Sequence, residues 1–491
     1  MNRRRTAFFL LLLLATTACK VGPNYKRPAI VTPDKWREME AANASVAELP
    51  WWEMFQDQQL QELIRIALVE NKDLKIAVER IEEARAIYGF TRSDLYPAVD
   101  ASAAAGGIRF SEGSVTHTPE TLTTRDNDRA IFTLGLGLSW ELDFFGRIRR
   151  ATEAQRANLL ATEEARRSVV LTLVADVARA YMELRDFDRR LEVARRTLES
   201  RREYVELARI RFEGGLTSEV DWRQAQAEFY RTEAFVHDFE RLVAQKENEI
   251  SVLLGRNPSS ILRGRTLEEQ PVPPAVPPGL PSALLERRPD IRQAEQELVA
   301  ANARIGEAKA QLFPRIALTA SYGFASTELD QLLDTSSQSG SIFAGLLQPI
   351  FNAGKNRRRV EVRESQFRQA VTSYERTVLR AFREVEDSLM AHRKAGDQLL
   401  SQRERVQAER KVLELAELRY RGGVAPYLEV LDAQRALFNA EIELTQVTSD
   451  RLVSLIRLYK SLGGGWSDVQ APPAPPTGPP TAPAENGKPG H

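Results

Sequence analysis

The segment Phe132-Thr-Leu-Gly-Leu-Gly-Leu-Ser-Trp-Glu-Leu142 alternates large apolar residues with small or polar ones. A period of two, with one apolar face and one small, polar face, is typical of a membrane strand that has lipid outside and water inside. A strand of an ordinary β-sandwich can show the same alternation, so the segment alone leaves both interpretations open. The apolar face consists of Phe132, Leu134, Leu136, Leu138, Trp140 and Leu142.

The residues that follow predict a very long helix. No glycine or proline occurs from Arg147 to Phe212, which corresponds to ~99 Å of α-helix at 1.5 Å per residue. A second such stretch, Lys355–Arg421, contains Gly396 as its one glycine. Helices of this length indicate coiled-coil packing or a helical tube. Each stretch ends at a pair of glycines, which is typical of a left-handed helix cap followed by a tight turn.

The chain contains the same unit twice. Residues 71–97 match residues 288–314 at an offset of 217, and from the next strand onward the offset is 208. Each unit is expected to hold a helix that ends at Pro97 or Pro314, two strands, a long helix and a shorter return helix. The strands are expected at about 98–110 and 131–143 in the first unit, and at about 315–325 and 341–351 in the second. The 208 offset assigns to the apolar face Ile342, Ala344, Leu346 and Ile350, whereas Gln348 fits that face poorly.

The return helices, 216–254 and 427–462, are too short to flank the long ones alone. Adding 290–313 to 216–254, and 71–96 to 427–462, gives about the length of a long helix, so we expect the short helices to stack end to end in these two pairs. The proline-rich segment 256–289 has no helical period and is expected to form an equatorial belt at the junctions.

Both ends of the chain are of unusual composition. Residues 1–18 have a basic start and a short apolar run, which predict a signal peptide, and the run is shorter than the ~20 residues of a membrane-spanning helix. Cys19 stands where bacterial lipoproteins are cleaved and acylated, so we expect palmitate-type lipidation there; a plain signal peptide is the alternative. Residues 464–491 are proline-rich and predict a disordered tail.

Composition disfavours several classes of function. The 491 residues include 68 basic and 68 acidic residues, and this balance argues against a nucleic-acid partner. One cysteine and four scattered histidines provide no metal-binding pattern, and no phosphate-binding glycine motif occurs. We therefore expect no catalytic site, no metal and no cofactor.

Four strands cannot close a membrane barrel, and an open edge in lipid leaves backbone groups unsatisfied. Two copies would give eight strands and a plugged lumen, and three would give twelve and a channel. The small residues of the inner face favour the homotrimer.

Three motifs indicate a family. Cys19-Lys-Val-Gly-Pro-Asn-Tyr-Lys-Arg-Pro28, Trp51-Trp52 with the apolar positions after it, and Leu431-Asp-Ala-Gln-Arg435 resemble TolC-like outer membrane factors of the NodT/OprM lipoprotein branch. The resemblance covers about residues 19–466. In bacterial lipoproteins, an Asp directly after the acylated cysteine retains the protein in the inner membrane. This chain has Lys20 at that position, which agrees with an outer membrane location.

The resemblance implies a mainly α fold with a membrane β-barrel portion. Three chains would form a 12-stranded β-barrel joined to a 12-helix periplasmic α-barrel. Its function would be passive exit of small molecules or drugs from a multidrug efflux pump. The implied partners are a periplasmic adaptor (membrane fusion) protein and an inner-membrane transporter of the resistance-nodulation-division (RND) type. A duct for type I protein secretion is the close alternative, and a lipid-anchored coiled-coil scaffold without a pore is a more distant one.

The domain organisation expected from these features is a signal peptide at 1–18, a lipidated belt segment at 19–56 and a first repeat at 57–255. A linker at 256–289, a second repeat at 290–463 and the tail at 464–491 complete it.

The resemblance also assigns site residues. The helix tips would contact the adaptor through backbone and small side chains, although the same residues are also what a tight turn requires. They are Gly214, Gly215, Leu216, Thr217, Ser218, Gly422, Gly423, Val424, Ala425 and Pro426. A periplasmic gate would use Leu428 and Asp432, with Glu219 and Asp221 as weaker candidates; a solvated helix face is the alternative for all four.

Overall fold

The computed structural model describes residues 20–37, 54–109, 128–270 and 279–464. The chain divides into two compact units. Unit 1 consists of Met1–Val31, Val78–Ala165 and Asp290–Leu379, and unit 2 consists of Thr32–Ala77, Arg166–Pro289 and Arg380–His491. Unit 1 contains the strands, and unit 2 contains both tight turns between long and return helices.

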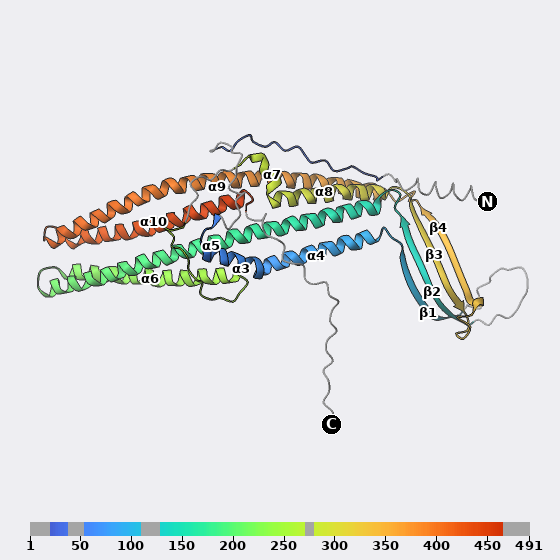
Figure 1. Cartoon of the computed structure of the whole chain (residues 1–491), viewed down its shortest axis with the longest axis horizontal. Helices are drawn as coiled ribbons and strands as arrows, with labels where there is room; N and C mark the ends of the chain where they lie inside the picture. The colour runs from blue at the N-terminus through green and yellow to red at the C-terminus, as the bar shows by residue number, and fades with distance from the viewer. Residues whose placement is uncertain (1–19, 38–53, 110–127, 271–278, 465–491) are drawn as a thin grey trace, which may run out of the picture. The chain divides into compact units, whose positions relative to one another are not determined.

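The strands form one antiparallel sheet in the order β1-β2-β3-β4 (Figure 1). Their bounds are Ala98–Arg109, Asp128–Leu142, Arg315–Ser326 and Gln338–Leu347. The first three overlap the predicted ranges closely, but the fourth starts and ends earlier than predicted. Pro349 has no N–H to donate to a strand ladder. Just before it, the side-chain Nε2 of Gln348 donates to the Leu312 carbonyl at 3.2 Å.

The strand register brings the apolar positions of all four strands to one face. Leu138 lies opposite Ala320, and Ala320 lies opposite Ile342. Ala344 and Leu346 follow on the same face of β4, as the repeat predicts. Ile350 lies beyond the end of β4, so its assignment to this face was wrong.

Two helices of 67 residues dominate the fold, α5 (Arg147–Glu213) and α9 (Lys355–Arg421). Both helices continue without interruption over the two stretches that were predicted from their lack of glycine and proline. Gly396 lies within α9 and does not interrupt it. The return helices are α6 (Glu219–Leu253) and α10 (Tyr427–Ser461). In unit 2 each long helix and its return helix form a hairpin (Figure 1).

The shorter helices are α3 (Gln58–Glu70), α4 (Lys72–Ser93) and α8 (Pro289–Ala310). End-to-end contacts occur in unit 2, but with the partners exchanged relative to the sequence prediction, which was wrong because helix lengths alone do not decide the pairing. Asn71 Nδ2 at the start of α4 donates to the Leu253 carbonyl at the end of α6 at 2.8 Å. Arg288, just before α8, donates in the same way to Ser461 of α10 at 2.9 Å.

α4 and α8 end several residues before Pro97 and Pro314, and so earlier than the sequence indicates. Their last residues continue in tight turns, with Tyr96 N bonded to Ser93 O at 2.9 Å and Phe313 N to Ala310 O at 3.2 Å. Because a residue before proline is disfavoured in the helical conformation, the helix ends before it reaches the proline.

The linker packs on unit 2 around the buried carboxylate of Asp57. This side chain caps α3 and also accepts hydrogen bonds from Arg265 N at 2.9 Å and Gln270 Nε2 at 2.8 Å. A 3-10 turn, η2 (Pro281–Ala283), and the one-turn helix α7 (Leu284–Arg287) follow. Residues 256–270 of the linker contain no helix or strand and are held to unit 2 by these polar contacts and by the buried Ile261 and Leu267.

An arginine fixes the start of the described chain within unit 1. Arg150 is fully buried, and its guanidinium donates to the carbonyls of Val21 and Gly22, each at 3.0 Å. Gly22 has a φ of +99°, and a Cβ there would lie 2.4 Å from the Cα of Gly306. Only glycine allows the two backbones to approach this closely.

Candidate functional site

The turn between α5 and α6 forms the first helix tip. Leu216 N donates to Arg211 O and Gly215 N to Phe212 O, both at 2.9 Å, which is the hydrogen-bond pattern of a Schellman cap. Gly215 has a φ of +71°, a conformation that glycine adopts without steric cost. Leu216 is 77% exposed at this turn. The first tip therefore presents an uncovered apolar side chain beside exposed glycine backbone.

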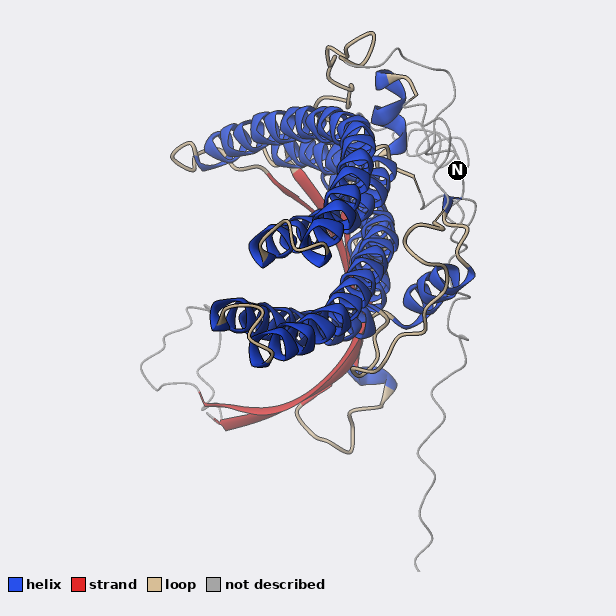
Figure 2. Cartoon of the chain, turned by 90° about the vertical axis from the view of Figure 1, so that its left-hand side faces the viewer, coloured by secondary structure: helices blue, strands red, loops and turns tan. Residues whose placement is uncertain are grey.

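The turn between α9 and α10 repeats this geometry, and Figure 2 looks onto both turns. Val424 N donates to Arg419 O at 3.0 Å, and Gly423 N donates to Tyr420 O at 3.1 Å. Gly423 has a φ of +73°, and Val424 is 72% exposed. The two tips thus offer the same kind of surface twice.

The tips differ in how their return helices begin. Ser218 caps α6, and its hydroxyl accepts a hydrogen bond from Val220 N at 3.2 Å. A proline suits the first position of a helix, but Pro426 is instead the N-cap of α10 and makes no side-chain cap bond. Its extended ψ of 158° makes the buried Tyr427 the first helical residue.

An aromatic cluster joins the two hairpins behind the tips, and the sequence analysis missed it. Tyr420 and Tyr427 have ring centroids 5.6 Å apart, and the guanidinium of Arg211 from α5 lies 4.5 Å from the centre of the Tyr420 ring. Buried residues of α5, α6, α9 and α10 complete the cluster. Two tyrosines that flank the second glycine pair were the signal available in the sequence.

The gate candidates fall into two groups. Leu428 and Asp432 lie one turn apart on an exposed face of α10, with Leu428 49% exposed and the Asp432 side chain 64% exposed. Arg435 approaches Asp432 at 3.5 Å. Glu219 and Asp221 lie on the other hairpin, in the first turn of α6, and Glu219 pairs with Arg223 at 2.9 Å. The role of all four as a gate stays a prediction.

Beneath the tips lies a buried ion cluster that the sequence did not reveal. The Glu228 carboxylate accepts from Arg201 of α5 at 2.9 Å and from Arg435 of α10 at 2.8 Å. Burial opposes ionisation of Glu228, but the bonds from Arg435 and the charge of Arg201 outweigh it and lower its pKa. Arg201 also donates to Thr232. One carboxylate of α6 thereby connects α5 with α10.

The apolar face of the sheet is open to its surroundings. On β2, Leu134 and Leu136 are 40% and 53% exposed, and on β4 Ile342 is 77% exposed. The cross-strand neighbours of Leu134 and Leu136 on β3 are Phe324 and Tyr322. Contact of this face with lipid stays a prediction.

The remaining predictions concern the lipidation site, the tail, metal binding and membrane-spanning helices. Cys19 and the proline-rich tail lie outside the described residues. Within the described ranges, no cluster of His, Cys, Asp and Glu side chains is placed to hold a metal ion. None of the helices in the described part of the chain combines the length and the apolar character needed to cross a membrane.

Comparison with known proteins identifies the family. The outer membrane efflux protein family matches residues 63–256 and 280–464. The solvent efflux pump outer membrane protein SrpC of Pseudomonas putida is 39% identical over 480 residues, which cover 96% of this chain and 100% of SrpC. The cation efflux system protein CusC of Escherichia coli K12 is 34% identical, over 92% of this chain and 97% of CusC.

The fold is that of solved channels. The structure of the open state of the MtrE outer membrane channel of Neisseria gonorrhoeae aligns with a TM-score of 0.82 and 31% identity, over 91% of this chain and 99% of MtrE. The outer-membrane channel OprN aligns with a TM-score of 0.83 and 31% identity, over 91% of this chain and 100% of OprN. This chain belongs to the outer membrane efflux protein family, whose members are channels rather than enzymes, and it is an outer membrane channel of a tripartite efflux pump.

Proposed function

We propose that three copies of this chain close one 12-stranded barrel and serve as the passive exit for small organic molecules. The observation that carries the proposal is the four-stranded sheet, in which β1 and β4 each have one edge without a partner strand among the described residues. Unpaired strand edges are not tolerated in lipid, so other copies must pair with them. The apolar face, which includes Leu136 and Ile342, then faces the bilayer, and the face with Gly135, Gly137 and Ser139 lines the lumen.

The helix tips are the proposed contact with a periplasmic adaptor. Support comes from Leu216 and Val424, two apolar side chains that are more than 70% exposed at equivalent positions of the two turns. Apolar side chains that project from rigid turns are suited to a protein interface. Energy for transport would come from an inner-membrane RND transporter, the partner that the family resemblance implies. The proposal of organic substrates rests on the resemblance to the solvent efflux protein SrpC.

The proposed gate consists of Leu428 and Asp432. In a trimer, three copies of each would surround the pore, with the leucines narrowing it and the aspartates favouring cations. Replacing both residues by alanine should raise the conductance of the closed channel in planar lipid bilayers and reduce its cation preference. A matched double variant of Leu415 and Glu414, exposed residues of α9 outside the tip, serves as control. Unchanged conductance in the Leu428/Asp432 variant would remove these residues from the gate.

Cys19 is the proposed site of lipid attachment. The next residues are bound at the end of the sheet: Val21 N donates to Phe145 O at 3.3 Å, and Lys20 pairs with Glu153 at 2.5 Å. An acyl group on Cys19 would therefore be attached to the residue next to Lys20, whose ion pair with Glu153 holds this part of the chain close to the start of α5. Radiolabelled palmitate should label the wild-type protein in cells and should not label Cys19→Ser. Equal labelling of both proteins would exclude this site.

A further inference from the structure

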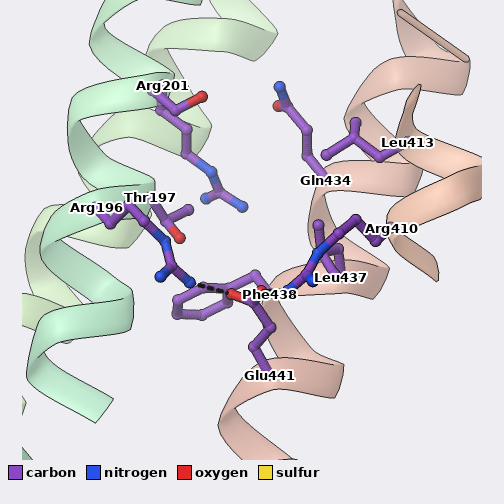
Figure 3. Close-up of a pocket in the computed structure, with 10 residues that line it drawn as sticks. Arg196, Thr197, Arg201, Arg410, Leu413, Gln434, Leu437, Phe438 and Glu441 are labelled. Atoms are coloured by element: carbon purple, nitrogen blue, oxygen red, sulfur yellow. Dashed lines mark hydrogen bonds and ion pairs between the residues drawn. The ribbon is translucent and has the colours of Figure 1, made fainter. Parts of the chain in front are cut away.

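Unit 2 contains a pocket that neither the tips nor the proposed gate uses. Its volume is about 390 Å³, and it lies between α5 of the first hairpin and α9 and α10 of the second (Figure 3). Phe438, Leu413 and Leu437 provide its apolar surface. A water molecule occupies about 30 Å³ in the liquid, so the pocket has room for a small polyatomic ligand.

The polar lining is predominantly basic. Arg196 and Arg410 approach the pocket from opposite sides and share one carboxylate, that of Glu441, at 2.6 and 3.0 Å. Figure 3 shows both arginines converging on Glu441. Arg201 lines the same pocket and shares Glu228 with Arg435. The lining itself thus contains three arginines, Arg196, Arg201 and Arg410, and one acidic residue, Glu441.

Two buried atoms of the lining have no hydrogen-bond partner among the described residues. One is the donor Nε of Arg201, whose side chain is 4% exposed, and the other is the acceptor Oε1 of Gln434, which is 7% exposed. In Figure 3 both side chains project into the space between α5 and α10. Buried polar groups are rarely left unsatisfied, and one pocket with an unpaired donor and an unpaired acceptor suits a ligand that can both accept and donate.

We propose that this pocket binds a phosphate group that carries a protonated oxygen, either inorganic phosphate or a phosphate monoester. Its anionic oxygens accept from Arg201 Nε and from Arg410, which guanidinium groups do especially well for phosphate. Its P–OH group donates to Gln434 Oε1. The hydroxyls of Thr197 and Ser200, which also line the pocket, are further donors. The ligand would link α5 with α9 and α10, and so bridge the two hairpins.

Isothermal titration calorimetry of the full-length protein in detergent tests the proposal. Inorganic phosphate and sulfate are titrated at constant ionic strength and pH 6, where inorganic phosphate and about half of a phosphate monoester carry a P–OH group and sulfate has no O–H to donate. Saturable binding of phosphate is expected, with sulfate several-fold weaker. Arg410→Gln should weaken phosphate binding about tenfold by removing one charge-assisted contact. Gln434→Met should abolish the preference for phosphate over sulfate.

Arg405→Gln is the matched control, because Arg405 is another exposed arginine of α9 that pairs with a glutamate of α10, Glu443, outside the pocket. Its phosphate affinity should equal that of the wild type. Glycerol phosphate is titrated as well: tighter binding than inorganic phosphate indicates a monoester as the natural ligand, and weaker binding indicates the free ion. Absence of saturable phosphate binding in the wild type, or equal affinity in wild type and Arg410→Gln, would overturn the proposal.

Discussion

At the residue scale, Glu228 is the carboxylate on which two arginines from different helices converge. The Glu228 side chain is 5% exposed and the Arg201 side chain is 4% exposed, so loss of the carboxylate leaves a buried guanidinium uncompensated. Breaking a buried pair in this way costs about 3–5 kcal/mol. We expect Glu228→Ala to lower the free energy of unfolding by about this amount. Glu228→Gln should cost less, because its amide oxygen still accepts a hydrogen bond.

Thermal unfolding in detergent, followed by the helical circular dichroism signal, measures these losses. Glu206→Ala is the control, because Glu206 makes an exposed pair with Arg209 one turn away on α5, and such surface pairs contribute little. We expect no measurable shift for Glu206→Ala. If the Glu228→Ala protein unfolded at the same temperature as this control, the cluster would have no role in stability.

At the scale of the element, α9 contains one glycine inside the helix and a pair at its end, and these should respond in opposite ways to alanine. Gly396 has open space where a Cβ would lie, so Gly396→Ala should stabilise the helix by about 0.5–1 kcal/mol. Gly423 has a φ of +73°, where a Cβ costs roughly 1–2 kcal/mol, so Gly423→Ala should destabilise. Unfolding by denaturant gives the free energy of unfolding of each variant relative to the wild type. A higher free energy of unfolding for Gly423→Ala would contradict the positive φ of this turn.

The elements were largely predictable because their signals are local. An absence of glycine and proline marks α5 and α9, and alternation of side chains marks β2. The end of β4 was predicted wrongly because the offset of 208 aligns Ile350 with Leu142, which lies within β2. Pro349 ends the strand in the second repeat, whereas the equivalent residue of the first repeat is Glu141. The Arg201–Glu228–Arg435 cluster and the phosphate pocket were not predictable. Each depends on which charged residues of separate helices become neighbours, and charges are frequent along all of these helices.

At the scale of the whole molecule, the open sheet makes a single chain incomplete, and the proposed trimer predicts which strands must meet. Within one chain, β1 and β4 are separated by two strands, or ~14 Å at about 4.8 Å per step. A disulfide needs Cα atoms within ~7 Å. Cysteines placed in β1 and β4 can therefore join only between chains. We combine Ala103→Cys with Gly340→Cys, Ile342→Cys or Ala344→Cys, which lie on the same face.

Oxidation of at least one of these pairs in membranes should give a ladder on denaturing gels that ends at three times the monomer mass. The reason is that a closed ring of three chains has three β1–β4 contacts and no free edge left to extend. Ala103→Cys with Leu134→Cys is the control, because these residues are register partners in one chain and should form a disulfide without changing the mass. A ladder that stops at two, or that continues beyond three, would contradict the 12-stranded barrel, since only three copies of a four-stranded sheet supply that number of strands.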